Sequence, residues 1–148
     1  MPTHSEKRVM PHSADQMYQL IADIEAYEDF LPWVAAARIT RRQVEADHEI
    51  VDADLVVSFK VFREKFGSRV TLRPALHEID VAYLDGPFKY LNNHWKFTPI
   101  DHTSCEVSFF VDFEFRSFIL QKMIGVVFTE AMERIVRAFE ARAKDLYG

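Results

Sequence analysis

The spacing of hydrophobic positions near the amino terminus changes at Ser13. Residues 3–11 alternate loosely between polar and apolar and end at a proline, which predicts a strand at the edge of a sheet. After Ser13, apolar residues recur at helical spacing through about Tyr27, and Gln16 stands where a capping box requires it. The sequence therefore predicts a helical region that begins after Ser13 and breaks into two pieces near residues 29–33.

In residues 34–112 the apolar positions repeat every second residue, which is the side-chain period of a strand. Clusters of turn residues divide this region into successive runs. The alternation predicts antiparallel strands at about residues 35–43, 47–60, 64–74, 77–85, 90–100 and 103–115. One face of the third run is shared by Phe66, Ser68, Val70 and Leu72. We therefore expect a meander with one apolar face.

A last helix is predicted to start after Ser117, a good N-cap, and to run to about Leu146. Its first half, residues 118–128, is apolar nearly all round, which is expected of a helix that is enclosed on more than one side or that roofs a cavity. Together these elements predict an α+β fold in which a curved antiparallel sheet wraps around a long C-terminal helix. The length of 148 residues suits one such domain, residues 1–148.

The aromatic content exceeds what a domain of this size needs for packing, with 13 Phe, 5 Tyr and 2 Trp. The excess fits either a Phe-rich core or an apolar cavity that holds a hydrophobic small molecule. In the cavity hypothesis a hydrocarbon tail lies inside, and ring residues in segments 30–33 and 86–91, near the mouth, stack on the head group. The candidate ligand-binding residues are Phe30, Leu31, Trp33, Val57, Phe59, Phe66, Val70, Phe88, Tyr90, Leu91, Trp95, Phe113, Phe115, Phe118, Met123, Val127 and Phe128.

Charge and cysteine usage narrow the class of protein. The net charge of -5 repels phosphate backbones, so no nucleic acid is expected as a partner. Cys105 is the single cysteine and the six histidines lack ligand spacing, so neither a disulfide nor a metal site is expected. The first residues are polar and lack the apolar region of a secretory signal peptide. No stretch of consecutive apolar residues approaches the length of about 18 that a membrane-spanning helix needs. We therefore expect a cytoplasmic protein.

The side chains that could take part in catalysis are poorly placed for it. The paired carboxylates Asp52 with Asp54 and Asp112 with Glu114 alternate along strands on the polar face, away from the expected cavity. Another group of reactive side chains lies in one hairpin turn and comprises His102, Ser104 and Cys105. Such residues are ordinary in turns. No catalytic residues and no catalytic cofactor are therefore predicted.

Several segments, in order along nearly the whole chain, resemble the coenzyme Q (ubiquinone)-binding proteins of the START-like, or polyketide cyclase/dehydrase, superfamily. They are Tyr27–Trp33, Phe66–Pro74, Gly86–Leu91, Trp95–Pro99 and Ala138–Gly148. The resemblance implies a START-like helix-grip fold, ubiquinone as the bound ligand, and a role as a quinone chaperone or carrier in respiration. It also implies transient contact with a membrane or a respiratory complex, at the inner face of the cytoplasmic membrane.

Two alternatives remain open on the same fold. The ribosome-association toxin type is one, suggested by the Arg38, Arg41 and Arg42 cluster and opposed by the negative net charge. In the toxin branch a glycine tends to follow the proline that corresponds to Pro32. Here Trp33 follows Pro32, which resembles the quinone-binding branch. Many quinone-binding members carry a cysteine directly after this tryptophan, and here Val34 stands in its place. The other alternative is a polyketide cyclase-like enzyme, which requires ionisable groups inside the cavity.

Overall fold

The first and last strands of the chain pair with each other. The computed structural model describes residues 3–59 and 62–148, without the side chains of Phe59 and Phe62, and it contains one antiparallel sheet in the order β1-β7-β6-β5-β4-β3-β2. The strands of this sheet are β1 (Thr3–Met10), β2 (Val34–Val44), β3 (Glu49–Phe59), β4 (Phe62–Arg73), β5 (Glu78–Asp85), β6 (Phe88–Asp101) and β7 (Ser104–Phe115). Each predicted strand is therefore present, with ends shifted by a few residues.

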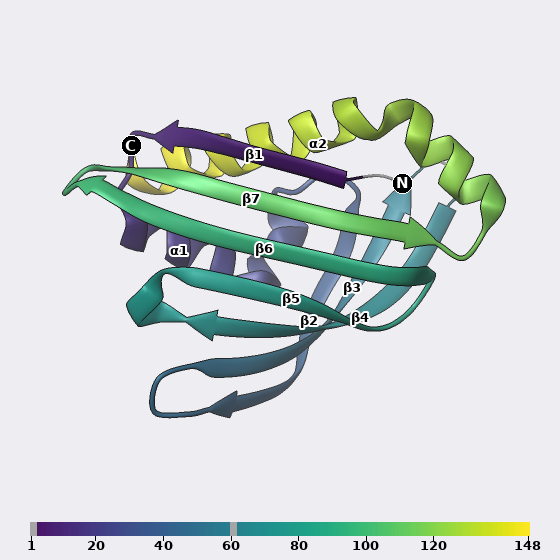
Figure 1. Cartoon of the computed structure of the whole chain (residues 1–148), viewed down its shortest axis with the longest axis horizontal. Helices are drawn as coiled ribbons and strands as arrows, with labels where there is room; N and C mark the ends of the chain where they lie inside the picture. Colours follow the sequence, from purple (N-terminus) through teal and green to yellow (C-terminus); the bar gives the residue numbers. More distant parts are fainter. Residues whose placement is uncertain (1–2, 60–61) are drawn as a thin grey trace.

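One long helix and several shorter ones accompany the sheet. They are α1 (Ala14–Ala22), the 3-10 helices η1 (Ile24–Asp29) and η2 (Pro74–Leu76), and α2 (Phe118–Tyr147). Figure 1 shows the strands as a single bent sheet, with α2 lying along it and α1 behind β6. This is the helix-grip arrangement, so the predicted α+β fold is confirmed.

The start of α1 follows the sequence prediction, but its end does not. The Ser13 hydroxyl accepts from the Gln16 backbone N–H at 3.1 Å, and the Gln16 side chain accepts from the Ser13 N–H at 3.0 Å. The predicted break near residues 29–33 was wrong, because α1 already ends at Ala22 and η1 begins at Ile24. The Tyr27 hydroxyl donates to the carbonyl of Ile21 and satisfies one of the carbonyls that a helix end leaves free.

The core lies between α2, α1 and one face of the sheet. Alternate residues of β7 from Cys105 to Phe115 are buried, as the two-residue period predicts. The ring of Phe139 on α2 meets Trp95 of β6 at 5.5 Å, and the ring of Phe128 meets Phe113 of β7 at 5.6 Å. These contacts between aromatic side chains join the helix to the sheet.

Gly86 brings the turn before β6 close against β4. Its φ of +137° is unfavourable for residues with a side chain, and a Cβ there would lie 2.5 Å from the Cβ of Phe66. The close approach sets the ring of Phe88 at 5.3 Å from that of Phe66. The glycine thus positions two aromatic rings on the inner face of the sheet.

Of the two arrangements predicted for residues 118–128, the structure has the first half of α2 roofing an apolar space above the sheet, and it is not enclosed on its outer side. Phe118, Ile119 and Val126 are 75%, 71% and 86% exposed. The residues between them that point inward reach the sheet, but nothing in the described part of the chain covers the outward ones. Among the described residues no helix combines the length and apolar composition that crossing a bilayer requires.

Candidate functional site

The interior contains two apolar chambers between the sheet and the helices. The first, here called the Ser68 chamber, has a volume of about 240 Å³ and is walled by α1, η1, the inner faces of β2 to β7 and the second half of α2. The second, here called the Met123 chamber, has a volume of about 230 Å³ and lies between the first two thirds of α2 and the inner faces of β3, β4, β6 and β7.

The two chambers adjoin, and together they are called the cavity here. Their common walls are Val57, Phe66, Leu91, Val111, Met132 and Ile135. Taken together they fall within the range of roughly 300–1,000 Å³ that is typical of small-molecule pockets. The apolar cavity proposed from the aromatic excess is therefore a feature of the structure.

Polar groups reach only the Ser68 chamber. Ser68 is 3% exposed, and its hydroxyl has no hydrogen-bond partner among the described residues. Asn93 donates from Nδ2 to the carbonyl of Phe110 at 2.8 Å and accepts at Oδ1 from the indole N–H of Trp95 at 3.0 Å. Tyr27 is the one titratable side chain among the described lining residues, and burial, reinforced by the charge of Asp23, raises its pKa.

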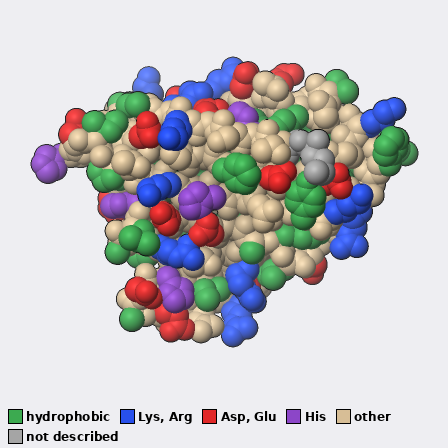
Figure 2. All heavy atoms as spheres, in the orientation of Figure 1, with side chains coloured by type: hydrophobic (Ala, Val, Ile, Leu, Met, Phe, Trp, Pro, Cys, Tyr) green, Lys and Arg blue, Asp and Glu red, His purple; other side chains and the backbone are tan. Residues whose placement is uncertain are grey.

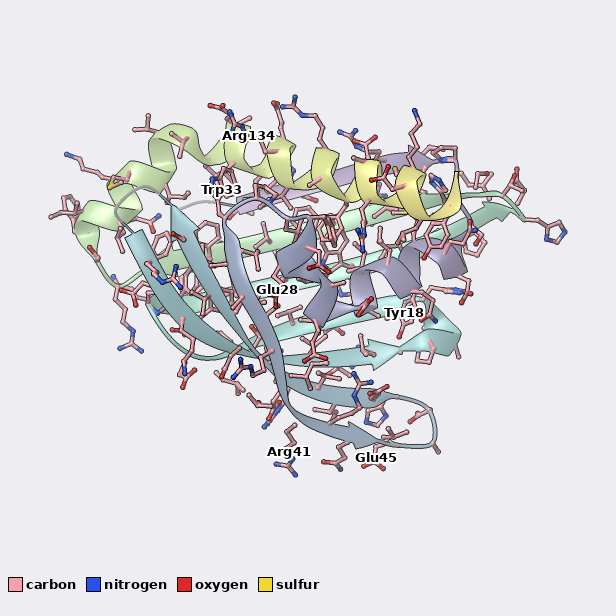
Figure 3. The ribbon with its side chains drawn as sticks, turned by 180° about the vertical axis from the view of Figure 1, so that it is seen from behind. Tyr18, Glu28, Trp33, Arg41, Glu45 and Arg134 are labelled. Carbon is pink, nitrogen blue, oxygen red and sulfur yellow. The ribbon has the colours of Figure 1, made fainter. Side chains whose placement is uncertain are left out.

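Trp33 lines the Met123 chamber with a strained backbone. Its φ of 66° is in the left-handed region, which is uncommon for a bulky residue. The Ser58 N–H donates to the Trp33 carbonyl at 2.7 Å and ties the loop to β3. Figure 3 shows Trp33 at the start of β2, beneath α2. Strain of this kind is often kept where a residue serves a ligand site.

Most of the predicted binding residues come together around the cavity. Those that line the Ser68 chamber are Leu31, Val57, Phe66, Val70, Leu91 and Trp95. Those that line the Met123 chamber are Trp33, Val57, Phe66, Phe88, Leu91, Phe113, Phe115 and Met123. Both segments expected near the mouth, 30–33 and 86–91, thus contribute cavity walls.

Two predicted residues from a loop and a strand lie elsewhere. Tyr90 stands opposite Glu114 on the outer face, because it is next to the inward Leu91 in the two-residue alternation of β6. Phe30 packs on Tyr27 and Phe139 outside both chambers. The side chain of Phe59 lies outside the described residues.

Three further predicted residues that do not line the cavity belong to the first half of α2. Phe118 is the first residue of the helix and points outward. Phe128 packs between Phe113 and His4 of β1, at ring distances of 5.6 and 6.2 Å. Val127 is half-buried and lines neither chamber. A helix presents only one side to a cavity, and an apolar pattern all round does not indicate which side.

Several lining residues were missed from the sequence. Ile21, Ile24 and Tyr27 line the Ser68 chamber from the predicted helical region. The apolar stripe of the helical pattern places Ile21 and Ile24 toward the core but does not distinguish a cavity wall from packed core. Ser68 and Asn93 carried a signal, because each is a polar residue in a position where the alternation places it on the apolar face.

A wider cleft of about 480 Å³ lies on the side of α1. It is bordered by both apolar and charged side chains, including Tyr18, Asp23, Arg42, Glu49 and Arg142. Although larger, it is lined by groups that attract water, so it suits a hydrophobic ligand less than the two chambers do.

The carboxylates considered for chemistry lie on the outer face of the sheet. Arg69 donates to both carboxylate oxygens of Asp52, at 2.9 and 3.1 Å, and these bonds lower the pKa of Asp52. Thr3 donates to Asp112, and Lys89 pairs with Glu114 at 3.1 Å. They are ion-paired or hydrogen-bonded surface groups, and none of them lines a chamber.

The hairpin-turn group is also unsuited to nucleophilic chemistry. Cys105 is completely buried, and burial raises the pKa of its thiol to about 11. The Ser104 hydroxyl donates to Asp101 at 2.8 Å, and His102 is exposed. Among the described residues no group of three His, Cys, Asp or Glu side chains could hold a metal ion.

Comparison with known proteins gives one family model and several relatives that span the chain. The model described as polyketide cyclase / dehydrase and lipid transport matches residues 10–140. A ribosome association toxin RatA from Rickettsia prowazekii is 38% identical, with 99% of each chain covered. The mitochondrial coenzyme Q-binding protein COQ10 homolog B of Xenopus laevis is 31% identical over 98% of this chain and 59% of its own length.

A solved structure shares both sequence and fold. The 18 kDa protein CC1736 from Caulobacter crescentus is 37% identical, with a TM-score of 0.82 and coverage of 100% of this chain and 99% of its own. The RatA of Rickettsia prowazekii thus matches at higher identity than this coenzyme Q-binding relative, although the sequence features had favoured the quinone-binding branch.

Proposed function

The chain belongs to the polyketide cyclase/dehydrase and lipid transport family, and from this premise we propose that it binds an isoprenoid quinone, ubiquinone, in the cavity formed by the two chambers. The observation that carries the proposal is the nearly unbroken apolar lining of this cavity. An isoprenoid chain gains about 0.8 kcal/mol for each CH2 removed from water. The ring of Trp95 in the Ser68 chamber offers a face on which a quinone ring can stack, and the rings of Trp33 and Phe88 add apolar wall to the Met123 chamber.

The same proposal assigns the protein no chemistry of its own. Proton transfer in a cavity requires a titratable group near neutral pH. Among the described lining residues only Tyr27 titrates, its hydroxyl is engaged with the Ile21 carbonyl, and burial holds its pKa above the ordinary value. These features favour a cytoplasmic carrier or chaperone that supports respiratory electron transport over a polyketide cyclase-like enzyme.

Association with ribosomes is the second candidate, and the relatives named RatA favour it. Its surface would be the arginines of β2, the edge strand of the sheet. These arginines face acidic residues across the β2–β3 pairing, where Arg38 stands opposite Asp54 and Arg41 opposite Asp52. Neighbouring carboxylates reduce the attraction of this edge for phosphate. The surface electrostatics therefore support the quinone proposal more than the ribosome one.

Direct binding tests the first candidate. The two tryptophans of the chain, Trp33 and Trp95, both line the cavity, so a quinone bound there should quench the intrinsic fluorescence. We expect saturable quenching by a short-tail ubiquinone, and quinone in organic extracts of the purified protein by mass spectrometry. If neither is found while overexpression changes ribosomal subunit association on sucrose gradients, the second candidate replaces the first.

A further inference from the structure

Ser68 occupies a position where a hydroxyl is costly without a partner. It lies in β4, which is paired on one side with β3 and on the other with β5, so no free strand edge is near it. Its side chain shares the cavity wall with Phe66 and Val70. A buried donor without an acceptor destabilises a protein, and native structures rarely keep one without a reason.

The polar groups of the cavity are also unevenly distributed. Ser68 and Asn93 both face the Ser68 chamber, and the Asn93 amide retains one N–H beyond the one that the Phe110 carbonyl accepts. The Met123 chamber is lined by aliphatic, aromatic and methionine side chains, including Leu120 and Ile124. The cavity is therefore amphipathic along its length, with hydrogen-bond donors in one half only.

Building on the proposed function, we infer that Ser68 donates a hydrogen bond to an acceptor oxygen of the ligand, which lies in the Ser68 chamber with its hydrocarbon chain in the Met123 chamber. The acceptor is expected to be an uncharged carbonyl and not a carboxylate. Among the described residues no cationic side chain lines the chamber to neutralise the charge of a carboxylate. This orientation differs from the one expected from the sequence, in which the head group stacks on rings near the mouth.

A matched pair of variants isolates the hydroxyl. Ser68→Thr keeps it and Ser68→Val replaces it with a methyl group, and the two side chains have nearly the same size. For a short-tail ubiquinone, measured by tryptophan quenching, we expect affinity to be roughly 2- to 10-fold weaker in Ser68→Val than in Ser68→Thr. For an analogue with the same tail on an oxygen-free benzene ring, measured by displacement of a fluorescent apolar probe, the two variants should bind equally.

The ligand-free proteins should show the opposite order of stability. Ser68→Val removes the unpartnered donor, so its Tm should be about 2–4 °C above that of Ser68→Thr. Equal quinone affinities of the two variants would overturn the assignment of Ser68 while leaving quinone binding intact. A wild-type protein that binds neither probe would overturn both this inference and the proposed function.

A second inference rests on the outer side of α2. Phe118, Ile119, Lys122 and Val126 form one stripe along the first turns of the helix, here called the outer α2 stripe. The Lys122 ammonium lies 5.7 Å above the Phe118 ring. Figure 2 shows hydrophobic and basic side chains next to each other at the end of the molecule where α2 begins.

The charge at this end is opposite to that of the whole chain. Between residues 115 and 129 the only charged residues are Arg116 and Lys122, although the net charge of the chain is -5. Nearby on β7, Glu114 is paired with Lys89. Exposed apolar side chains combined with cations are typical of surfaces that bind anionic lipid. A second copy of the chain fits less well, because it would bring Lys122 against Lys122 over a small apolar area.

We propose that the outer α2 stripe docks on an anionic phospholipid bilayer, with its apolar side chains in the interface and its cations at the head groups. Ligand-free protein should sediment with phosphatidylcholine vesicles that contain phosphatidylglycerol, and less with phosphatidylcholine alone. Val126→Asp should weaken this binding roughly tenfold. Lys122→Gln should weaken it about fivefold on the anionic vesicles only.

Val44→Asp is the matched control, because Val44 is 72% exposed in the β2–β3 hairpin, away from α2. It should bind vesicles as the wild type does. Absence of wild-type binding, or equal losses in Val44→Asp and Val126→Asp, would overturn the docking proposal without touching the cavity. So would a dimer that Val126→Asp dissociates, since a second copy would then cover the stripe.

Discussion

Replacing Ala131 by phenylalanine is expected to lower quinone affinity more than tenfold while leaving the protein folded. Ala131 lies on α2 and lines the Met123 chamber. A phenyl ring there occupies space that the ligand chain needs. If two methylene groups of the chain are displaced into water, at about 0.8 kcal/mol each, the quinone affinity falls by more than tenfold. Because the ring enters space that already exists, the free energy of unfolding should stay within about 1 kcal/mol of the wild type. Tryptophan quenching and urea denaturation measure the two quantities.

Ala143→Phe is the control on the same helix. Ala143 is completely buried but lines neither chamber, so a ring there should overpack the core and lower stability by about 1–3 kcal/mol. The difference in helix propensity between alanine and phenylalanine is the same in both variants. A loss of stability in Ala131→Phe as large as in Ala143→Phe would mean that the Met123 chamber is filled by side chains in solution.

The second large effect is expected at Phe97, where truncation to alanine should lower the free energy of unfolding by about 3–5 kcal/mol. Phe97 is 1% exposed and packs against Tyr18 and Trp95, at ring distances of 6.1 and 6.3 Å. It lines neither chamber, so its removal leaves a new void. Urea denaturation of the ligand-free protein gives the value.

Phe113→Ala provides the comparison within the same set of aromatic residues. One side of the Phe113 ring already faces the Met123 chamber and makes no contact there. Its truncation should therefore cost less, about 1–3 kcal/mol. If the two truncations were equally destabilising, the division of the phenylalanines into packing and cavity-lining groups would be mistaken.

The strands and the last helix could be predicted because local patterns determine them. The two-residue alternation of β7 and the N-cap at Ser117 are readable without tertiary contacts. The end of α1 was not readable, because the apolar spacing continues past Ala22 into η1, from which the Tyr27 hydroxyl donates to the carbonyl of Ile21. That contact forms between side chain and backbone only in the folded chain.

The site was predictable where strand parity holds, and Tyr90 was wrongly included for its ring although its parity places it on the outer face. Parity along β4 and β7 placed Phe66, Val70 and Phe113 on the inner face, and they line the cavity. The shift between Phe88 and Tyr90 reverses parity within β6 and turns Phe88 inward, whereas Tyr90 faces outward with His94 as the alternation requires. The outward orientation of Phe118 was equally hidden, because an apolar residue is the same letter in the sequence whether it faces a core or solvent.

The pairing of β1 with β7 also affects how the chain is synthesised. Thr3 stands opposite Asp112 and Met10 opposite Cys105, so strands from opposite ends of the sequence must meet before the sheet is complete. Pairings over such long sequence separations form slowly. During translation β1 has no partner in the sheet until β7 has also left the ribosome. Until then the nascent chain exposes unpaired strand edges that chaperones can recognise.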